Sequence, residues 1–247
     1  MMKDMKHQIS RPVIDSRLLG IIRREIKKQD IPVAPLSKRK LVEMAETVKE
    51  IEAREIPKHL ILKKLSHGLG HGIFLRADAE PILKGRVIAS YGGLITVVAQ
   101  NERDDNGDYA FAPLEHFCLT KEEHALWDRK YPYHPRRQYA LKLDALKKGN
   151  FTRFINHSVK PNVYADMVKI PANNLGLDPA PIEIVYLAQK TIQPGEQLLI
   201  CYEAGEKSYW NASGIKPFPM TPRTFRVDSK GKLIHLANRC KLCDNRR

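Results

Sequence analysis

The chain has 247 residues, of which 43% are hydrophobic and 28% charged. This ordinary globular composition excludes collagen-like, coiled-coil and wholly disordered chains. No apolar run approaches the ~20 residues that cross a bilayer, and the first residues, MMKDMKHQISR, lack the apolar stretch of a secretory signal. We therefore expect no membrane association and no signal-directed secretion; export by a route that reads no such signal stays open.

The net charge of +14 is unevenly distributed along the chain. Residues 1–64 and residues 206–247 each carry an excess of seven positive charges, whereas residues 65–205 sum to zero. Basic flanks are typical of proteins that bind an anionic partner such as nucleic acid. Residues 101–123 hold seven acidic and two basic side chains, which predicts a surface that attracts a basic ligand. A merely solvated surface is the alternative in both cases.

Two amphipathic helices are predicted near the N-terminus. The Asp-Ser pair at 15–16 can cap the first helix, which ends before Pro32, and Ser37 can start the second, which ends before Pro57. Each carries apolar residues at three- and four-residue steps. They predict a basic helical extension over residues 1–56, packed on the main domain.

The pattern then changes to short segments rich in Ile, Val, Leu and Tyr, separated by Gly, Asn and Pro. This pattern predicts short strands in small curved sheets. The predicted strands are His59–Leu62, Gly72–Leu75, Arg86–Tyr91, Leu94–Val98, Tyr139–Leu143, Asn162–Ala165, Glu183–Leu187 and Gln197–Cys201.

Between the predicted strands, Thr120 and Glu123 form a capping box for one short helix. Two long loops are expected, at residues 101–108 and 170–181. The tail beyond Trp210 is basic, contains three prolines and lacks periodicity. We expect this tail to be partly disordered.

The first glycine cluster is Gly68-Leu69-Gly70-His71-Gly72. A dinucleotide-binding fingerprint would require a helix at its end, but Ile73-Phe74-Leu75 follows and predicts a strand. The cluster therefore indicates backbone that passes close to a ligand; a tight hairpin turn is the alternative.

Three further motifs follow along the chain. They are Tyr91-Gly92-Gly93; Gly149-Asn-Phe-Thr-Arg-Phe-Ile-Asn-His-Ser158 with Pro161-Asn162; and Pro194-Gly-Glu-Gln-Leu-Leu-Ile-Cys-Tyr202. In the second motif, two Asn and one His flank the proline, and apolar Phe154 and Ile155 stand just upstream; together they indicate polar groups placed inside a pocket. In the third, a turn delivers a buried strand that ends in a tyrosine.

Taken in order, these motifs resemble a SET domain, the family of protein-lysine methyltransferases that use S-adenosylmethionine. The resemblance covers roughly residues 60–205, and the style is that of compact, bacterial-type members. It implies a mainly β fold with α additions: small curved β-sheets, with a C-terminal segment threaded under the Asn-His-Ser loop as a pseudoknot. It also divides the chain into an N-terminal helical extension (1–56), a SET domain (57–205) and a basic C-terminal tail (206–247), a remnant of a post-SET segment.

The resemblance implies a set of site residues. The implied cofactor-binding residues are Gly68, Leu69, Gly70, Tyr91, Arg153, Asn156, His157, Tyr202 and Trp210. Tyr202 matches the catalytic tyrosine, and Tyr109 and Tyr139 are the candidates for the other tyrosines of the lysine channel. Residues 101–123 fall where the family has a variable insert beside its peptide groove.

Four cysteines without even spacing favour a reducing compartment. Cys240 and Cys243 supply two of the four ligands that zinc needs, and His235 and Cys201 complete a site only if the fold brings them close. In the family's chromatin branch a cysteine often follows Asn-His-Ser and helps to bind zinc, but Val159 stands there. We therefore expect no zinc-built closure; a tail helix around Trp210 is the alternative cover for the cofactor.

The sequence thus predicts an S-adenosylmethionine-dependent protein-lysine N-methyltransferase that acts on a basic protein, a histone or histone-like protein. A methyltransferase for a non-chromatin protein is one alternative. A catalytically silent SET module that binds chromatin or nucleic acid through the flanks is another, and a nucleic-acid-binding protein without a cofactor is a third. The expected location is the cytoplasm, chromatin or a nucleoid, or a host cell after export.

Overall fold

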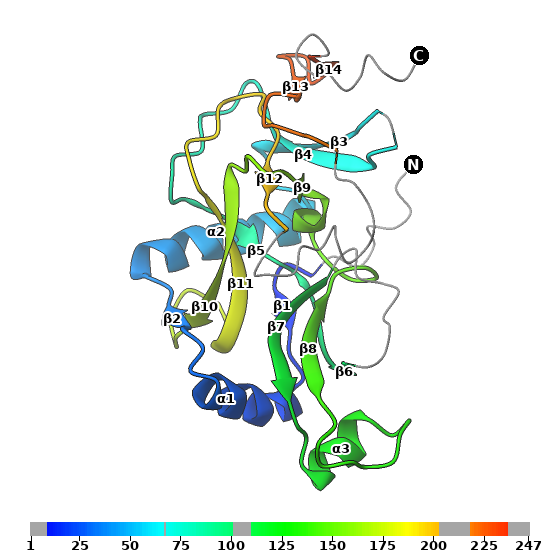
Figure 1. Cartoon of the computed structure of the whole chain (residues 1–247). Helices are drawn as coiled ribbons and strands as arrows, with labels where there is room; N and C mark the ends of the chain where they lie inside the picture. Colours follow the sequence, from blue (N-terminus) through cyan, green and yellow to red (C-terminus); the bar gives the residue numbers. More distant parts are fainter. Residues whose placement is uncertain (1–8, 67, 101–109, 203–217, 237–247) are drawn as a thin grey trace. The chain divides into compact units, whose positions relative to one another are not determined.

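The structure, a computed structural model, describes residues 9–66, 68–100, 110–202 and 218–236 (Figure 1). The helices are η2 (Ser16–Leu18), α1 (Leu19–Lys28), α2 (Lys38–Arg54), α3 (Lys121–Trp127) and η4 (Phe151–Phe154). The strands are β1 (Pro12–Val13), β2 (Ala34–Pro35), β3 (Leu60–Lys64), β4 (His71–Leu75), β5 (Val87–Ser90), β6 (Gly93–Ala99), β7 (Ala110–Phe117), β8 (Tyr139–Asp144), β9 (Asn156–His157), β10 (Val163–Ile170), β11 (Ala180–Ala188), β12 (Leu199–Ile200), β13 (Phe225–Val227) and β14 (Leu233–His235). The mainly β fold class is confirmed.

All three predicted helices are present. The Asp15 side chain accepts a hydrogen bond from the Arg17 backbone and caps η2, which leads into α1. Helix α2 buries Leu41, Met44, Val48 and Ile51, the predicted apolar face. The capping box of Thr120 and Glu123 begins α3.

Every predicted strand overlaps a strand of the structure, although the limits differ. Strand β10 continues five residues past the predicted end at Ala165, and β12 is only two residues long. Strand β7 was not predicted, because Pro113 stands within it and its pairing with β8 is irregular between Phe111 and Phe117. The short strands β1, β2 and β9 were also missed.

Residues 218–236 of the tail are structured and include strands β13 and β14, which the sequence did not predict; the rest of the tail, for which partial disorder was expected, lies outside the described residues. The two strands pair antiparallel, with Arg226 opposite Ile234. They are ordered because Phe225 and Val227 are buried in an apolar cluster that was not visible from periodicity. The other buried members of that cluster are Leu65, Phe74, Leu199 and Met220.

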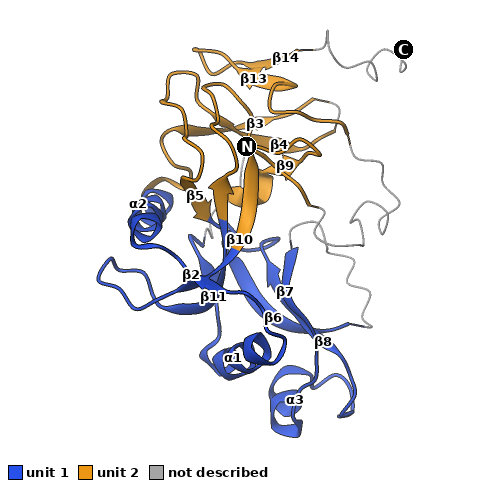
Figure 2. Cartoon of the chain, turned by 60° about the vertical axis from the view of Figure 1, so that its left-hand side comes forward, with its two compact units in different colours: residues 1–52, 90–150, 167–185 blue, residues 53–89, 151–166, 186–247 orange. Residues whose placement is uncertain are grey.

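The chain divides into two compact units, coloured in Figure 2. Unit 1 consists of residues 1–52, 90–150 and 167–185, and unit 2 of residues 53–89, 151–166 and 186–247. Unit 1 contains a four-stranded sheet of order β1-β6-β8-β7. A second sheet has the order β5-β11-β10-β12-β9, with β2 beside β10, and β10 and β11 contribute residues to both units.

Unit 2 has a threaded connection at its centre. Strand β12 lies between β9 and β10 and runs parallel to both, so His157 and Val163 flank Ile200 on its two sides. The five residues that join β9 to β10 must therefore arch over β12. This arrangement is the pseudoknot that the resemblance implied, and it is an exception to the usual rule that chains do not thread loops.

Candidate active site

The arch over β12 is held by side chains of the Asn-His-Ser motif and its extension. The side chain of Asn162 donates to the Gln197 carbonyl oxygen at 2.9 Å and accepts from the Leu199 backbone at 2.8 Å. The backbone N–H of Ser158 donates to the carbonyl oxygen of Ile200 at 2.8 Å. Because Asn162 is completely buried, these bonds are shielded from water and fix β12 under the loop.

Tyr202, the predicted catalytic tyrosine, lies two residues after the threaded strand and is held at two points. Its backbone N–H donates to Nδ1 of His157 at 3.0 Å, and its hydroxyl donates to the carbonyl oxygen of Ile155 at 2.9 Å. The His157 and Tyr202 rings lie 5.4 Å apart between centroids. The phenol oxygen therefore has a defined position, with its proton directed at a backbone carbonyl.

Asn156 joins the same site to the glycine-rich loop. Its side-chain amide donates to the carbonyl oxygen of His71 at 2.7 Å, the first residue of β4 and the residue after Gly70. Asn156 is half-buried, while His157 is buried. Unit 2 thus brings the glycine loop, the Asn-His pair and Tyr202 together.

The loop itself is shaped by glycine. Gly68 and Gly70 have φ angles of +72° and +69°, in the left-handed region that glycine adopts without strain. An added Cβ would meet nothing within 4 Å at either position, so open space borders this backbone. The Gly70 carbonyl accepts from the Leu65 N–H at 2.8 Å, and the Leu69 side chain packs against the apolar cluster of unit 2. The loop is therefore a fixed rim of exposed backbone.

Arg153 lies in η4, just before the Asn-His pair. Its guanidinium carbon is 4.9 Å from the centroid of the Phe154 ring, and that ring packs edge-on against His71 at 5.8 Å between centroids. Arg153 thus lies beside the aromatic pair that links η4 to the start of β4. A supporting role for this residue remains a prediction.

Tyr91 belongs to unit 1 and is almost fully buried. Its backbone N–H donates to the Ile184 carbonyl at 2.9 Å, and its ring packs edge-on against Phe111 at 4.8 Å. The glycines after it allow the N-terminal segment to approach: a Cβ on Gly92 would lie 1.9 Å from the carbonyl oxygen of Ile9. The Tyr91-Gly-Gly motif is therefore explained, at least in part, by close backbone packing.

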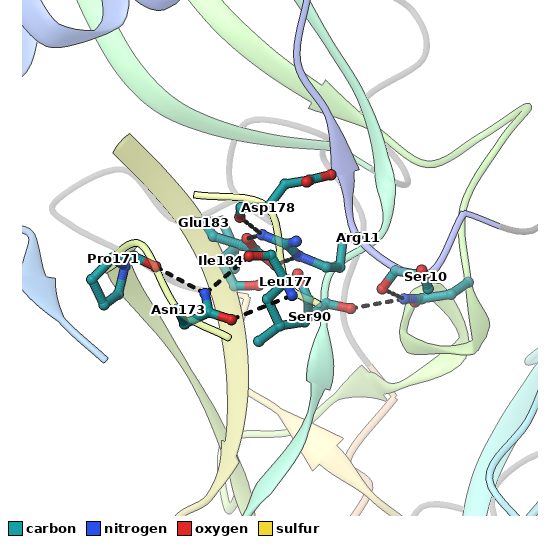
Figure 3. Close-up of polar contacts among 10 residues, drawn as sticks. Ser10, Arg11, Ser90, Pro171, Asn173, Leu177, Asp178, Glu183 and Ile184 are labelled. Atoms are coloured by element: carbon teal, nitrogen blue, oxygen red, sulfur yellow. Dashed lines mark hydrogen bonds and ion pairs between the residues drawn. The ribbon is translucent and has the colours of Figure 1, made fainter. Parts of the chain in front are cut away.

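Residues 9–13 are joined to the rest of unit 1 by side chains as well as by the pairing of β1 with β6 (Figure 3). The amide of Asn150 donates to the carbonyls of Ser10 and Ser90, at 3.1 and 2.8 Å. Arg11 forms a two-point ion pair with Glu183, at 2.7 and 3.1 Å, and also donates to the carbonyl of Asp178 at 2.8 Å. These contacts make residues 9–13 an integral part of unit 1.

Tyr139, a second candidate for the lysine channel, lies in β8 of unit 1 and is 1% exposed. Its hydroxyl donates to Asp128 at 2.8 Å, and Arg137 pairs with the same carboxylate at 3.1 Å. Burial and the bond to the charged Asp128 raise the pKa of Tyr139 to about 12. The same carboxyl has a lowered pKa, since the bonds from Tyr139 and Arg137 outweigh its burial. These contacts favour a structural role for Tyr139, and its catalytic role remains untested.

Several predicted residues lie outside the described part of the chain: Tyr109, Trp210, Cys240, Cys243 and the acidic residues of 101–109. Within the described acidic segment, Glu123 pairs with Arg24 and caps α3, so its charge is not available to a ligand. His235 stacks on Phe225 at 4.6 Å. The described ranges contain no group of three or more His, Cys, Asp or Glu that could hold a metal ion.

Ser158 and Asn162 belong to the predicted site motif, although no role was predicted for either. The structure shows that both bind the threaded strand, and the hydroxyl of Ser158 also donates to the Met220 carbonyl at 2.5 Å. The acceptor carbonyls of Ile155 and His71 were missed, because a backbone acceptor leaves no signal in the sequence. None of the helices in the described ranges is long and apolar enough to span a bilayer.

A comparison with protein-family models matches the SET domain over residues 70–203, more than half of the chain. The chain belongs to the SET-domain family. The matched region begins within the glycine loop and ends one residue after Tyr202, and the threaded β12 lies inside it.

Curated relatives resemble part of the chain. A histone-lysine N-methyltransferase of Nicotiana tabacum, H3 lysine-9 specific SUVH1, is 32% identical over 127 residues, or 50% of this chain. Histone-lysine N-methyltransferase Su(var)3-9 of Drosophila melanogaster is 31% identical over 154 residues, or 60% of this chain. The chain spans only 16% and 20% of the lengths of these two relatives. Among solved structures, ATXR5 in complex with histone H3.1 superposes with a TM-score of 0.47 at 19% identity, covering 72% of this chain and 71% of that one.

Proposed function

We propose that this SET-domain protein is a protein-lysine N-methyltransferase that uses S-adenosylmethionine. The observation that carries the proposal is the placement of Tyr202: a tyrosine follows a threaded strand, its hydroxyl is bonded to the Ile155 carbonyl, and its backbone is bonded to His157. The family match and the activity for which the two curated relatives are named support this assignment.

The residues of unit 2 suit the proposed cofactor. Gly68 and Gly70 border open space with exposed backbone, which can approach a ligand closely because no Cβ intervenes. Asn156 and His157 lie next to this loop through the bond to His71. We assign Gly68, Leu69, Gly70, Asn156 and His157 to cofactor binding. When bound, S-adenosylmethionine supplies an electrophilic methyl group on a positively charged sulfur.

The reaction requires a neutral amine, whereas free lysine has a pKa of about 10.4. An apolar channel and a nearby positive charge both disfavour the ammonium form. A hydroxyl held by a carbonyl can orient the amine lone pair without trapping a charge, and backbone carbonyls can hold a methyl group through weak C–H···O contacts. The rate gain would come from alignment and loss of water, so Tyr202 acts as an orienting group, and no general base need be assigned.

The substrate is proposed to be a basic protein, of the histone or histone-like kind. Support comes from the curated relatives, which are named histone-lysine methyltransferases, and from the acidic residues 101–123 within residues 65–205, whose charges sum to zero. A chromatin or nucleoid location follows from this substrate class.

The proposal is tested with purified full-length protein, labelled S-adenosylmethionine, and a panel of core histones, a bacterial histone-like protein and an acidic protein. Tyr202→Phe removes one hydroxyl and should lower kcat roughly a hundredfold, since misalignment alone can cost that much, while cofactor affinity changes little. Tyr133→Phe, a partly exposed tyrosine of unit 1, is the matched control and should retain full activity.

Each outcome is decisive. Label on a basic protein that Tyr202→Phe abolishes supports the enzyme and its substrate class, and label only on the acidic protein would refute that class. Cofactor binding without transfer to any protein would refute the enzyme in favour of a silent binding module. A protein that does not bind S-adenosylmethionine at all would refute the cofactor site.

A further inference from the structure

The turn between β13 and β14 presents two lysines on a fixed backbone. Oδ1 of Asp228 accepts hydrogen bonds from the backbone N–H groups of Lys230 and Lys232, at 2.9 and 2.8 Å. The Gly231 N–H donates to the Asp228 carbonyl at 2.8 Å. Both lysine side chains are exposed, so a rigid turn directs two ammonium groups into solvent.

A third lysine reaches the same turn from β3. Ile61 and Lys63 lie on one face of this strand, because side chains alternate between faces. A Cβ on Gly231 would lie 3.6 Å from Cδ1 of Ile61 and 3.8 Å from Nζ of Lys63. The ammonium of Lys63 therefore lies beside the residue that separates the other two lysines. We call Lys63, Lys230 and Lys232 the lysine turn.

None of the three lysines forms an ion pair with another described residue, and the one carboxylate of the turn, Asp228, leaves it with an excess of two positive charges. The carboxylate of Asp228 is bonded to backbone N–H groups, and the buried Glu196 pairs with Arg223 at 3.1 Å. Over the described residues, unit 2 holds 14 basic and six acidic side chains. The apolar packing of the hairpin thus holds three positive charges close together. Their mutual repulsion lowers the stability of the fold unless an anion binds.

We propose that the lysine turn binds the phosphate backbone of double-stranded nucleic acid. Lysine ammonium groups act as point charges that suit phosphate oxygens. Residues 228–232, Asp-Ser-Lys-Gly-Lys, contain no arginine to read base edges and no aromatic ring to stack on single-stranded bases. The turn itself carries no apolar side chain, but Ile234 and Leu236 beside it are 40% and 43% exposed, so a lipid surface is one of the outcomes that the test distinguishes. The chemistry fits sequence-independent contact with a duplex.

The test measures fluorescence anisotropy of a labelled DNA duplex with the full chain, as a function of salt. The test variant is Lys63→Gln/Lys230→Gln/Lys232→Gln. The matched control is Lys27→Gln/Lys28→Gln/Lys38→Gln, which removes the same charge from exposed positions at the end of α1 and the start of α2. Each phosphate contact contributes about 0.9 to the slope of log K against log salt, so the test variant should lose about 2 to 3 units of slope and roughly a hundredfold in affinity near 0.15 M salt. The control should lose much less of both.

An equal loss in the two variants would overturn the proposal in favour of binding by net charge or by the N-terminal flank, and no loss in the test variant would overturn it as well. An RNA duplex should bind similarly if the backbone is the ligand. Tighter binding to anionic lipid vesicles, lost in the same variant, would contradict a nucleic-acid partner. The readout does not involve methyl transfer, so its failure leaves the proposed activity untouched.

Discussion

The ion pair of Arg11 and Glu183 allows a stability prediction with a defined magnitude. The Glu183 side chain is 1% exposed, and Arg11 contacts both carboxylate oxygens, at 2.7 and 3.1 Å. Arg11→Ala leaves that carboxylate buried without its positive partner. Removing one partner of a buried pair typically costs about 3–5 kcal/mol, because the remaining charge has lost its water and its partner. Stability of this size is a large fraction of what a domain possesses.

The assay is urea unfolding of the full chain at neutral pH, followed by circular dichroism. The matched control is Arg76→Ala, because Arg76 contacts both oxygens of Asp78 at 3.0 Å but both side chains are largely exposed. Exposed ion pairs contribute little to stability, so the control should hardly change the midpoint. Replacing both members of the buried pair, as Arg11→Met with Glu183→Leu, should recover much of the loss. If Arg11→Ala were no more destabilising than Arg76→Ala, the argument from burial would be refuted.

Two further predictions concern single buried groups. The raised pKa of Tyr139, about 12, means that its neutral form is favoured in the folded state, so its contribution, on the order of 2 kcal/mol, is present below pH ~10 and is lost between pH 10 and 12. Tyr139→Phe should flatten that part of the stability–pH curve and leave kcat unchanged; a large loss of kcat with normal stability would instead favour the catalytic role. In unit 2, a Cβ on Gly72 would lie 2.6 Å from Nε2 of the buried Gln197, so Gly72→Ala should cost about 1–3 kcal/mol in thermal unfolding. Gln197→Ala in the same chain should relieve that cost, and equal costs in both backgrounds would refute the clash.

The sequence predicted those parts of the fold in which side-chain pattern and backbone structure agree. Helix α2 has an uninterrupted apolar face, and the capping box of Thr120 begins α3 where expected. Strand β7 was not predicted, since Pro113 and the irregular pairing with β8 interrupt the alternation of apolar and polar residues. The β13–β14 hairpin was missed for a different reason: most of the residues that pack on Phe225 and Val227, such as Phe74, are distant in sequence.

The N-terminal segment illustrates the same limit. Composition indicated a basic extension over residues 1–56, and the structure shows how residues 9–13 are fixed: β1 pairs with β6, and Asn150 bonds to the backbone of Ser10. The buried pairing of Arg11 with Glu183 bridges 172 residues of sequence. A local sequence pattern cannot predict such a contact, because an arginine or a glutamate by itself is typical of a solvated surface.

The site motifs could be recognised in the sequence because the threaded strand restricts which residue types can surround it. A loop of five residues that arches over a buried strand needs polar groups to satisfy that strand's backbone, and the interior offers no water to do so. Asn162 supplies a donor and an acceptor to backbone two residues apart, at Gln197 and Leu199, which an amide can do and a carboxylate or an amine cannot. The same strand then delivers Tyr202 to His157 and Ile155. The residues that hold the pseudoknot together are therefore also those that position the tyrosine. Substituting Asn162 should displace Tyr202, even though no hydrogen bond joins the two side chains.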